Sequence, residues 1–179
     1  MSETLWDARR YPIGPFRYAP PASREERRER IEELAAFPAM LGRTLQRVSK
    51  SDWARSYRSG GWTVRQLVHH LADSHLNAFV RFKLALTAEQ PQITPIEEAR
   101  WAELADVTQV DPWVSVRLLE ALHIRWVSLL RAMAEEDFSR TYWHPAQGRA
   151  VTLEEALALY DWHGRHHLAH IELALEGLL

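Results

Sequence analysis

Helix-start signals divide this chain into four long stretches, none of which alternates apolar and polar residues as a half-buried strand does. Ser23 and Thr152 each stand three residues before a glutamate, which is the spacing of a capping box. Thr63 is the N-cap candidate of another stretch, and Asp111-Pro112 puts proline at a first helical position. These signals predict long helices over about 23–50, 63–86, 111–135 and 152–176.

The segments outside the long helices are shorter and richer in proline. Residues 1–21 contain several prolines and aromatic residues, which indicates an irregular arm. Thr94-Pro95 predicts a short extra helix through Leu104, and residues 138–151 predict a loop or a small hairpin. We therefore expect an all-α four-helix bundle, with an arm over 1–21 and a single domain over 22–179.

Size and composition exclude several classes of protein. A chain of 179 residues fits one domain that buries a real core, and it contains no cysteine that could form a disulfide or a thiolate metal site. It has no apolar run of about 18 residues and a formal charge of −2, and its first residues lack a basic segment followed by an apolar run. We expect a cytoplasmic protein that binds neither membranes nor nucleic acid.

Histidine is concentrated near the end of the chain, where residues 163–170 hold four of the nine. Residues four apart lie one above the other on a helix, so His166 can act with His170, and His163 can act with His167. A third histidine from another helix would complete a metal site. Neutral imidazole binds Zn, Ni, Cu and Fe, and three nitrogens on a tetrahedral ion leave one position for water or substrate.

Helical periodicity separates these four histidines. His163, His166 and His170 fall along one side of the main apolar stripe, in line with Leu159, where a side chain between core and solvent can line a pocket. His167 falls nearer the stripe itself, which favours a packed residue or a support for a ligand. Taken singly, a helical histidine is more often solvated or hydrogen-bonded than metal-bound, but four together favour a site.

Three more histidines belong to the second predicted helix. His75 falls at the centre of its apolar stripe, with His69 and His70 on opposite flanks, so geometry alone does not choose among them. The flank of His70 gives a weak preference for that residue, because it continues in a polar row that could line a cavity and bind substrate. This row consists of Ser74, Asn77 and Arg81.

The two remaining histidines look less suited to bind metal. His123 lies among apolar residues of the third long helix, which is typical of a hydrogen-bonded core histidine or of a group that supports a ligand. His144 precedes Pro145 in the predicted loop, and we expect it to be solvated.

The motif around Gly60-Gly61-Trp62, continued by His69-His70, and the closing His166-His167-Leu168-Ala169-His170 resemble the DinB/YfiT-like metal-dependent protein family over nearly the whole chain. The resemblance implies a four-helix bundle with one divalent metal per chain, Zn or Ni, on three histidines. Carried over residue by residue, the ligands would be His70, His166 and His170. A homodimer is expected because relatives are dimers.

Three functions stay open at this point. Members of the family's YfiT branch are described as metal-dependent hydrolases, and related proteins resemble bacillithiol S-transferases, which join a small thiol to an electrophile. A zinc protease carries His-Glu-x-x-His, but the inner position here is His167. A hydrolase using a metal-bound water would need another base, and Asp73 is near but poorly placed. We therefore favour the thiol transferase over the hydrolase, and either enzyme over a non-enzymatic helical binding protein.

Overall fold

A computed structural model describes residues 7–21 and 23–177 of the chain. Its long helices are α1 (Arg24–Leu45), α2 (Val64–Thr87), α5 (Pro112–Ala132) and α6 (Leu153–Glu176). The shorter elements are the 3-10 helices η1 (Asp52–Ala54) and η2 (Glu135–Ser139), the helices α3 (Glu98–Trp101) and α4 (Ala105–Gln109), and the strands β1 (Thr141–His144) and β2 (Arg149–Thr152).

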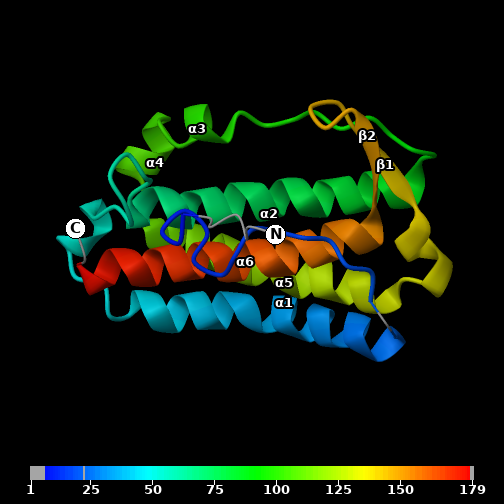
Figure 1. Ribbon diagram of the computed structural model, residues 1–179, viewed down its shortest axis with the longest axis horizontal. Coiled ribbons are helices and arrows are strands. Elements are labelled where there is room, and N and C mark those ends of the chain that lie inside the picture. Colours follow the sequence, from blue (N-terminus) through cyan, green and yellow to red (C-terminus); the bar gives the residue numbers. More distant parts are fainter. Residues whose placement is uncertain (1–6, 22, 178–179) are drawn as a thin grey trace, which may run out of the picture.

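The four long helices form the predicted bundle. α2 packs against α5 and α6, and α1 packs against the same two helices, so α1 and α2 lie at opposite corners. In the colour order of Figure 1, α1 and α6 run in one direction and α2 and α5 in the other. The connection from α2 to α5 therefore returns along the length of the bundle, and it carries α3 and α4 outside α2.

The predicted starts of the four long helices are confirmed. The side chains of Ser23, Thr63 and Thr152 each accept a hydrogen bond from the backbone N–H three residues later, at 3.2, 3.2 and 3.1 Å. Asp111 accepts from the N–H of Trp113 at 3.0 Å. The ends were predicted less well. The first helix stops at Leu45 rather than near residue 50, and the third long helix stops at Ala132 rather than near residue 135.

The predicted short helix from Thr94 to Leu104 is present only as α3, from Glu98 to Trp101, and the next helix, α4, begins beyond it at Ala105. The segment before α3 pairs with β1 instead: the Ile93 N–H donates to the Trp143 carbonyl at 3.1 Å. Residues 93–97 form no helical turn, and α3 begins at Glu98 without a side-chain cap, so Thr94 caps no helix. The alternative of a small hairpin over 138–151 is confirmed, with β1 and β2 antiparallel in the register Tyr142↔Val151.

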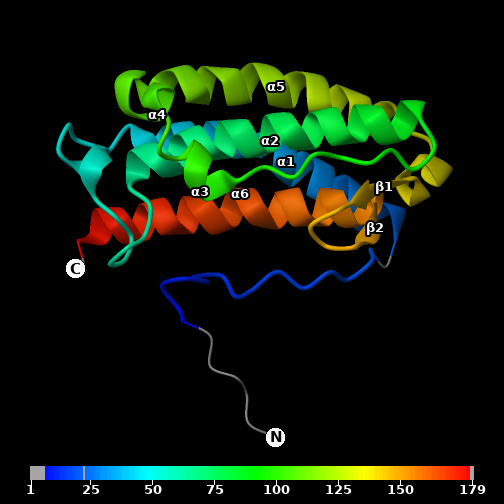
Figure 2. The same cartoon turned by 90° about the horizontal axis from the view of Figure 1, so that it is seen from above.

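The arm and the surface connections lie against the bundle. Within residues 7–21 the chain forms no regular helix or strand, and in Figure 2 this segment runs along α6. The Gly14 carbonyl accepts a hydrogen bond from the Trp162 indole N–H at 3.2 Å, and the Phe16 ring packs against the same indole. Among the described residues, no helix is both long enough and apolar enough to cross a membrane.

The core of the bundle consists of two apolar clusters with histidines at their junction. On α2, His75 stands between Ala72, the last member of one cluster, and Ala78, the first member of the other. On α6, His163 and His167 fall in the same gap between the clusters. A polar layer thus crosses an otherwise apolar interior, and buried polar groups of this kind need partners.

Candidate metal centre

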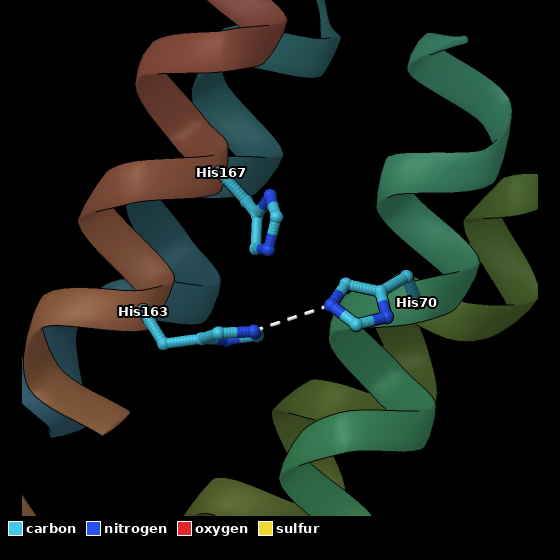
Figure 3. Close-up of side chains that lie close together, drawn as sticks. All are labelled: His70, His163 and His167. Carbon is cyan, nitrogen blue, oxygen red and sulfur yellow. Dashed lines mark hydrogen bonds between the residues drawn. The ribbon is translucent and has the colours of Figure 1, made fainter. Parts of the chain in front are cut away.

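Three imidazoles from two helices meet inside the bundle. His70 on α2 faces His163 and His167, which are one turn apart on α6 (Figure 3). One ligand atom from each of the three lies within 4.8 Å of the others, and Nε2 of His70 is 3.2 Å from Nε2 of His163. The capping box at Thr63 fixes the start of α2 less than two turns before His70.

The environment keeps these imidazoles neutral. Burial lowers the pKa of His70 to about 4. It also holds the pKa values of His163 and His167 well below the ordinary value, and the neighbouring histidines lower them further. A neutral imidazole keeps one unprotonated nitrogen, which is the form that binds a metal.

The separation of the nitrogens suits a tetrahedral metal ion. Two imidazole nitrogens at about 2.0–2.1 Å from zinc in tetrahedral geometry stand about 3.3 Å apart. The 3.2 Å between His70 and His163 is close to that value. Only histidines make up the group, and three nitrogen ligands are typical of a catalytic site that keeps an open position. The side chains present therefore fit a divalent ion such as zinc or nickel.

A second line of histidines lies behind His163. Nδ1 of His163 is 3.3 Å from Nε2 of His75, and Nδ1 of His75 is 2.9 Å from Nε2 of His123. Nδ1 of His123 donates to the Leu34 carbonyl at 2.8 Å. His75 and His123 are 0% and 2% exposed, so water does not replace these contacts. The prediction that His123 is a hydrogen-bonded core histidine is confirmed.

His167 has a partner of the same kind. Its Nδ1 lies 3.2 Å from Nδ1 of His170, and Nε2 of His170 donates to the Arg10 carbonyl at 3.2 Å. The His170 ring stacks on Tyr57 with a centroid separation of 3.8 Å. Both nitrogens of His170 are therefore engaged, and the arm contributes the acceptor for one of them.

The structure divides the histidines named from the family resemblance. His70 groups with His163 and His167, whereas His166 and His170 group with His167 on α6 alone. Among the described residues, the set His70, His166 and His170 does not form a group of this kind. His166 stacks on Trp162 at 4.3 Å, and its Nδ1 is buried with no hydrogen-bond partner.

Periodicity placed the site at the edge of the apolar stripe, but the imidazoles meet inside the bundle. His167 is 8% exposed and lies between His70 and the other α6 histidines, although the pattern favoured it as a packed residue. The signal that could have found this arrangement is the four-residue spacing of His163 and His167. The sequence contains that spacing twice and does not say which copy faces α2.

A cavity of about 680 Å³ opens beside the centre. His163, His166, His167 and His170 line it from α6, so the expectation that His163, His166 and His170 line a pocket is confirmed. The loop over 57–62, the arm, the crossover segment and the hairpin supply its other walls. These connections were not predicted as site elements, because a pattern of helical spacing carries no information about loops. The cavity is large enough for a small-molecule substrate next to the three imidazoles.

The charges on the cavity wall are mainly positive. Arg10, Arg58 and Arg81 line it, and none of the three forms an ion pair with another described residue. Glu98 of α3 is the only carboxylate among the described lining residues. An anionic molecule would therefore be favoured in the cavity. Asp73, the base considered from the sequence, does not belong to the described lining.

The structure separates the predicted polar row on α2 between two hollows on the surface. Ser74 and Arg81 line the cavity, and Arg81 donates a hydrogen bond to the Tyr160 hydroxyl at 3.3 Å. Asn77 lies in a neighbouring groove with Pro95, and its amide donates to the Asp73 carbonyl at 2.8 Å.

The two remaining histidines have separate environments. His69 is buried, with Nδ1 2.8 Å from the Ser115 hydroxyl. His144 was expected to be solvated in a loop, but it ends β1, is half-buried and lines the cavity. Pairing of β1 with β2 holds it there, and burial lowers its pKa.

The sequence from residue 33 to residue 171 matches the family model described as the DinB superfamily. The chain belongs to this superfamily. It is 47% identical over 161 residues to the Bacillus subtilis protein named "Putative metal-dependent hydrolase YfiT", a match that covers 90% of each chain. A relative from Oceanobacillus iheyensis with the same kind of name is 46% identical over 162 residues, covering 90% of this chain and 93% of the relative.

Solved structures confirm the fold. YfiT from Bacillus subtilis, described as having an unusual four-helix bundle topology, matches with a TM-score of 0.92 and 45% identity over 96% of this chain and 98% of that one. A mycothiol-dependent maleylpyruvate isomerase matches with a TM-score of 0.65 and 22% identity over 81% of this chain and 60% of that one. At that identity the likeness concerns the fold alone.

Proposed function

We propose that the chain is a metal-dependent enzyme that transfers a small anionic thiol to an electrophile, with one divalent metal held by His70, His163 and His167. The observation that supports the metal site best is the meeting of three neutral imidazole nitrogens within 4.8 Å at the side of a cavity. A divalent ion bound there would lower the pKa of a thiol or of water in its open position.

The charge of the cavity supports a thiol that carries a carboxylate. The cavity lining contains three arginines without ion-pair partners among the described residues and one glutamate. Arg81 is half-buried and near the Tyr160 hydroxyl, so a carboxylate paired with its guanidinium would be partly shielded from water. The chain has no cysteine of its own, so the reacting sulfur comes with the substrate.

The residues around the cavity have separate roles in this proposal. Arg81 and Ser74 orient the polar groups of the thiol beside the three imidazoles. The ring of Tyr57 stacks on His170 and the ring of Trp62 lies tilted against His70, and both exclude water from the same side. Exclusion of water strengthens every electrostatic contact within the cavity.

A direct experiment compares two reactions of the same preparation. Protein purified without chelator should contain about one divalent metal per chain by elemental analysis. It should then conjugate a bacillithiol-like or glutathione-like thiol to a panel of electrophiles, and removal of the metal should abolish the reaction. Hydrolysis of esters and amides that proceeds without thiol, together with no conjugation to any electrophile, would overturn the transferase.

Metal-dependent hydrolysis is the second candidate, and two observations support it. The relatives are named as metal-dependent hydrolases. Glu98 supplies a carboxylate on the cavity wall, where it could act as a general base, and desolvation raises its pKa. Glu98→Gln separates the two candidates, because it should reduce hydrolysis by about 100-fold or more and leave thiol conjugation nearly unchanged.

A further inference from the structure

We propose that two chains of hydrogen bonds, each anchored on a backbone carbonyl, fix the tautomers of His163 and His167 so that both turn a bare Nε2 toward the metal. His75 and His170, which contact these ligands, are then positioning residues and not ligands. The inference rests on the metal site proposed above, and it adds the groups that determine which nitrogen of each ligand is available.

The first chain begins at the Leu34 carbonyl of α1. A carbonyl oxygen only accepts hydrogen bonds, so the Nδ1 of His123 that contacts it at 2.8 Å carries the proton. The Nε2 of a neutral His123 is then bare and accepts from Nδ1 of His75 at 2.9 Å. By the same step, the Nε2 of His75 accepts from Nδ1 of His163 at 3.3 Å. Nε2 of His163 is left bare.

The second chain begins at the Arg10 carbonyl of the arm. That oxygen accepts from Nε2 of His170 at 3.2 Å, so the Nδ1 of His170 is bare. Nδ1 of His167, 3.2 Å away, must therefore be the donor. Nε2 of His167 is left bare, as in His163. Two carbonyls on opposite sides of α6 thus impose the same tautomer on the two ligands.

The packing prevents a simple exchange of these roles. In the other tautomer of His75, its Nε2–H would meet the Nδ1–H of His163, so two donors would face each other. Its bare Nδ1 would meet the bare Nε2 of His123, so two acceptors would face each other. The Phe37 ring stacks on His75 at 5.5 Å and lies 5.8 Å from the ring of His123, which holds both in place. A buried polar atom left without a partner is costly, so the alternative arrangement is disfavoured.

His70 has a different position in the network. The bare Nε2 of His163 lies 3.2 Å from its Nε2, so in the metal-free protein His70 must carry its proton on that nitrogen. The inference therefore predicts a pattern of tautomers for the metal-free protein. Nδ1 is protonated in His75, His123, His163 and His167, and Nε2 is protonated in His70 and His170.

The pattern can be read without any metal or substrate. Proteins labelled with ¹⁵N histidine, after chelator treatment and near pH 7.5, give two-bond ¹H–¹⁵N spectra that distinguish protonated from bare ring nitrogens. We expect His170 to differ in tautomer from His163 and His167. A spectrum in which His163 or His167 is protonated on Nε2 would overturn the inference, whether or not the protein binds metal.

Metal affinity provides the second test, by chelator competition with zinc. His75→Leu leaves the Nδ1–H of His163 unpaired and should weaken zinc binding by about 10–100-fold, the range typical of groups that support a metal ligand. His75→Gln restores an acceptor and should recover part of the loss. His69→Leu is the matched control, because His69 is also buried on α2 but contacts Ser115, and it should bind zinc as the wild type does.

These outcomes separate the inference from the proposed function. A wild-type protein that binds no zinc would contradict the metal site. The tautomer pattern of the metal-free protein would still test the two chains of hydrogen bonds. A wild-type protein that binds zinc, with a folded His75→Leu variant of unchanged affinity, would overturn the inference and leave the metal site standing. Circular dichroism and urea unfolding establish that the variants are folded, and the wild-type spectrum needs no variant.

Discussion

Gly164 of α6 lies against the ring of Phe37 on α1 so closely that a methyl group at Gly164 would be 2.9 Å from Cδ2 of that ring. Phe37 in turn stacks on His75 behind the candidate metal centre. The absence of a side chain at Gly164 therefore permits the close approach of α1 and α6 at the level of the histidine layer.

Gly164→Ala should destabilise the protein although alanine is the better helix former. Alanine in a helix interior gains about 0.5–1 kcal/mol over glycine, whereas overpacking of a core costs about 1–3 kcal/mol. We expect a net loss of up to about 2 kcal/mol in the free energy of unfolding by urea denaturation. Gly42→Ala in α1 is the control, since a methyl there meets nothing within 4 Å and should stabilise. Equal stability of the two variants would contradict the packing argument.

The sequence predicted the bundle because its helix signals are local. A capping side chain needs only the N–H groups of the next turn, so Ser23, Thr63 and Thr152 identify helix starts without any tertiary contact. Thr94 has the same appearance and caps no helix: the chain before it pairs with β1 at Ile93, and the next helix begins only at Glu98. A local signal carries no information about a pairing with so distant a segment.

The candidate site was predictable only in part. The sequence indicated a helical histidine site that includes His70. Which α6 histidines face α2 depends on how α6 is rotated about its axis in the bundle, and this rotation places His163 and His167 opposite α2. The cavity wall comes from loops that have no periodic signal. The homodimer, the cytoplasmic location and the domain bounds stay predictions.

Single alanine substitutions distinguish the two possible ligand sets. His163→Ala should lose zinc affinity by more than the roughly 10–100-fold typical of a supporting group, and His70→Ala and His167→Ala should do the same. His166→Ala should retain affinity near that of the wild type, and His170→Ala should fall within the range of a supporting group. Chelator competition measures each variant.

The comparison of His163→Ala with His166→Ala is decisive, because the two residues lie three positions apart on α6. If His166→Ala abolishes zinc binding while His163→Ala retains it, the ligand set carried over from the family resemblance is correct and the grouping seen in the structure is not the metal site.

Arg81→Ala should weaken the binding of an anionic thiol and leave the metal in place. Loss of a charge-assisted hydrogen bond costs about 1.5–3 kcal/mol, which corresponds to roughly 10–150-fold in affinity. Calorimetric titration of zinc-loaded protein with glutathione as the probe measures this change. Asn77→Ala is the control on the same helix, because Asn77 faces another groove. Equal affinity of glutathione for Arg81→Ala and wild type would remove Arg81 from the proposed site.

The stability of the metal-free protein should fall as the pH is lowered from 6.5 toward 4. Burial lowers several histidine pKa values to about 4, so between these two values the unfolded chain binds protons that the folded chain does not. The stabilisation is complete above the unfolded pKa and is lost as the pH falls. The residues concerned are His70, His123, His166 and His170.

Two aspartates act in the opposite direction, but the histidines should prevail. Burial raises the pKa values of Asp73 and Asp161 to about 6, so both favour the folded state as the pH falls below 6. The four histidines alone outnumber the two aspartates, and burial lowers the pKa values of His75, His163 and His167 further still. The net slope is therefore at least about 1–3 kcal/mol per pH unit, at about 1.4 kcal/mol per proton. Urea unfolding at pH 7, 5.5 and 4.5 after chelator treatment measures it. His123→Gln removes one of these titrating groups, so it should reduce the slope by the equivalent of about one proton. A free energy of unfolding that rises as the pH falls from 6.5 to 4.5 would contradict the neutral histidine layer.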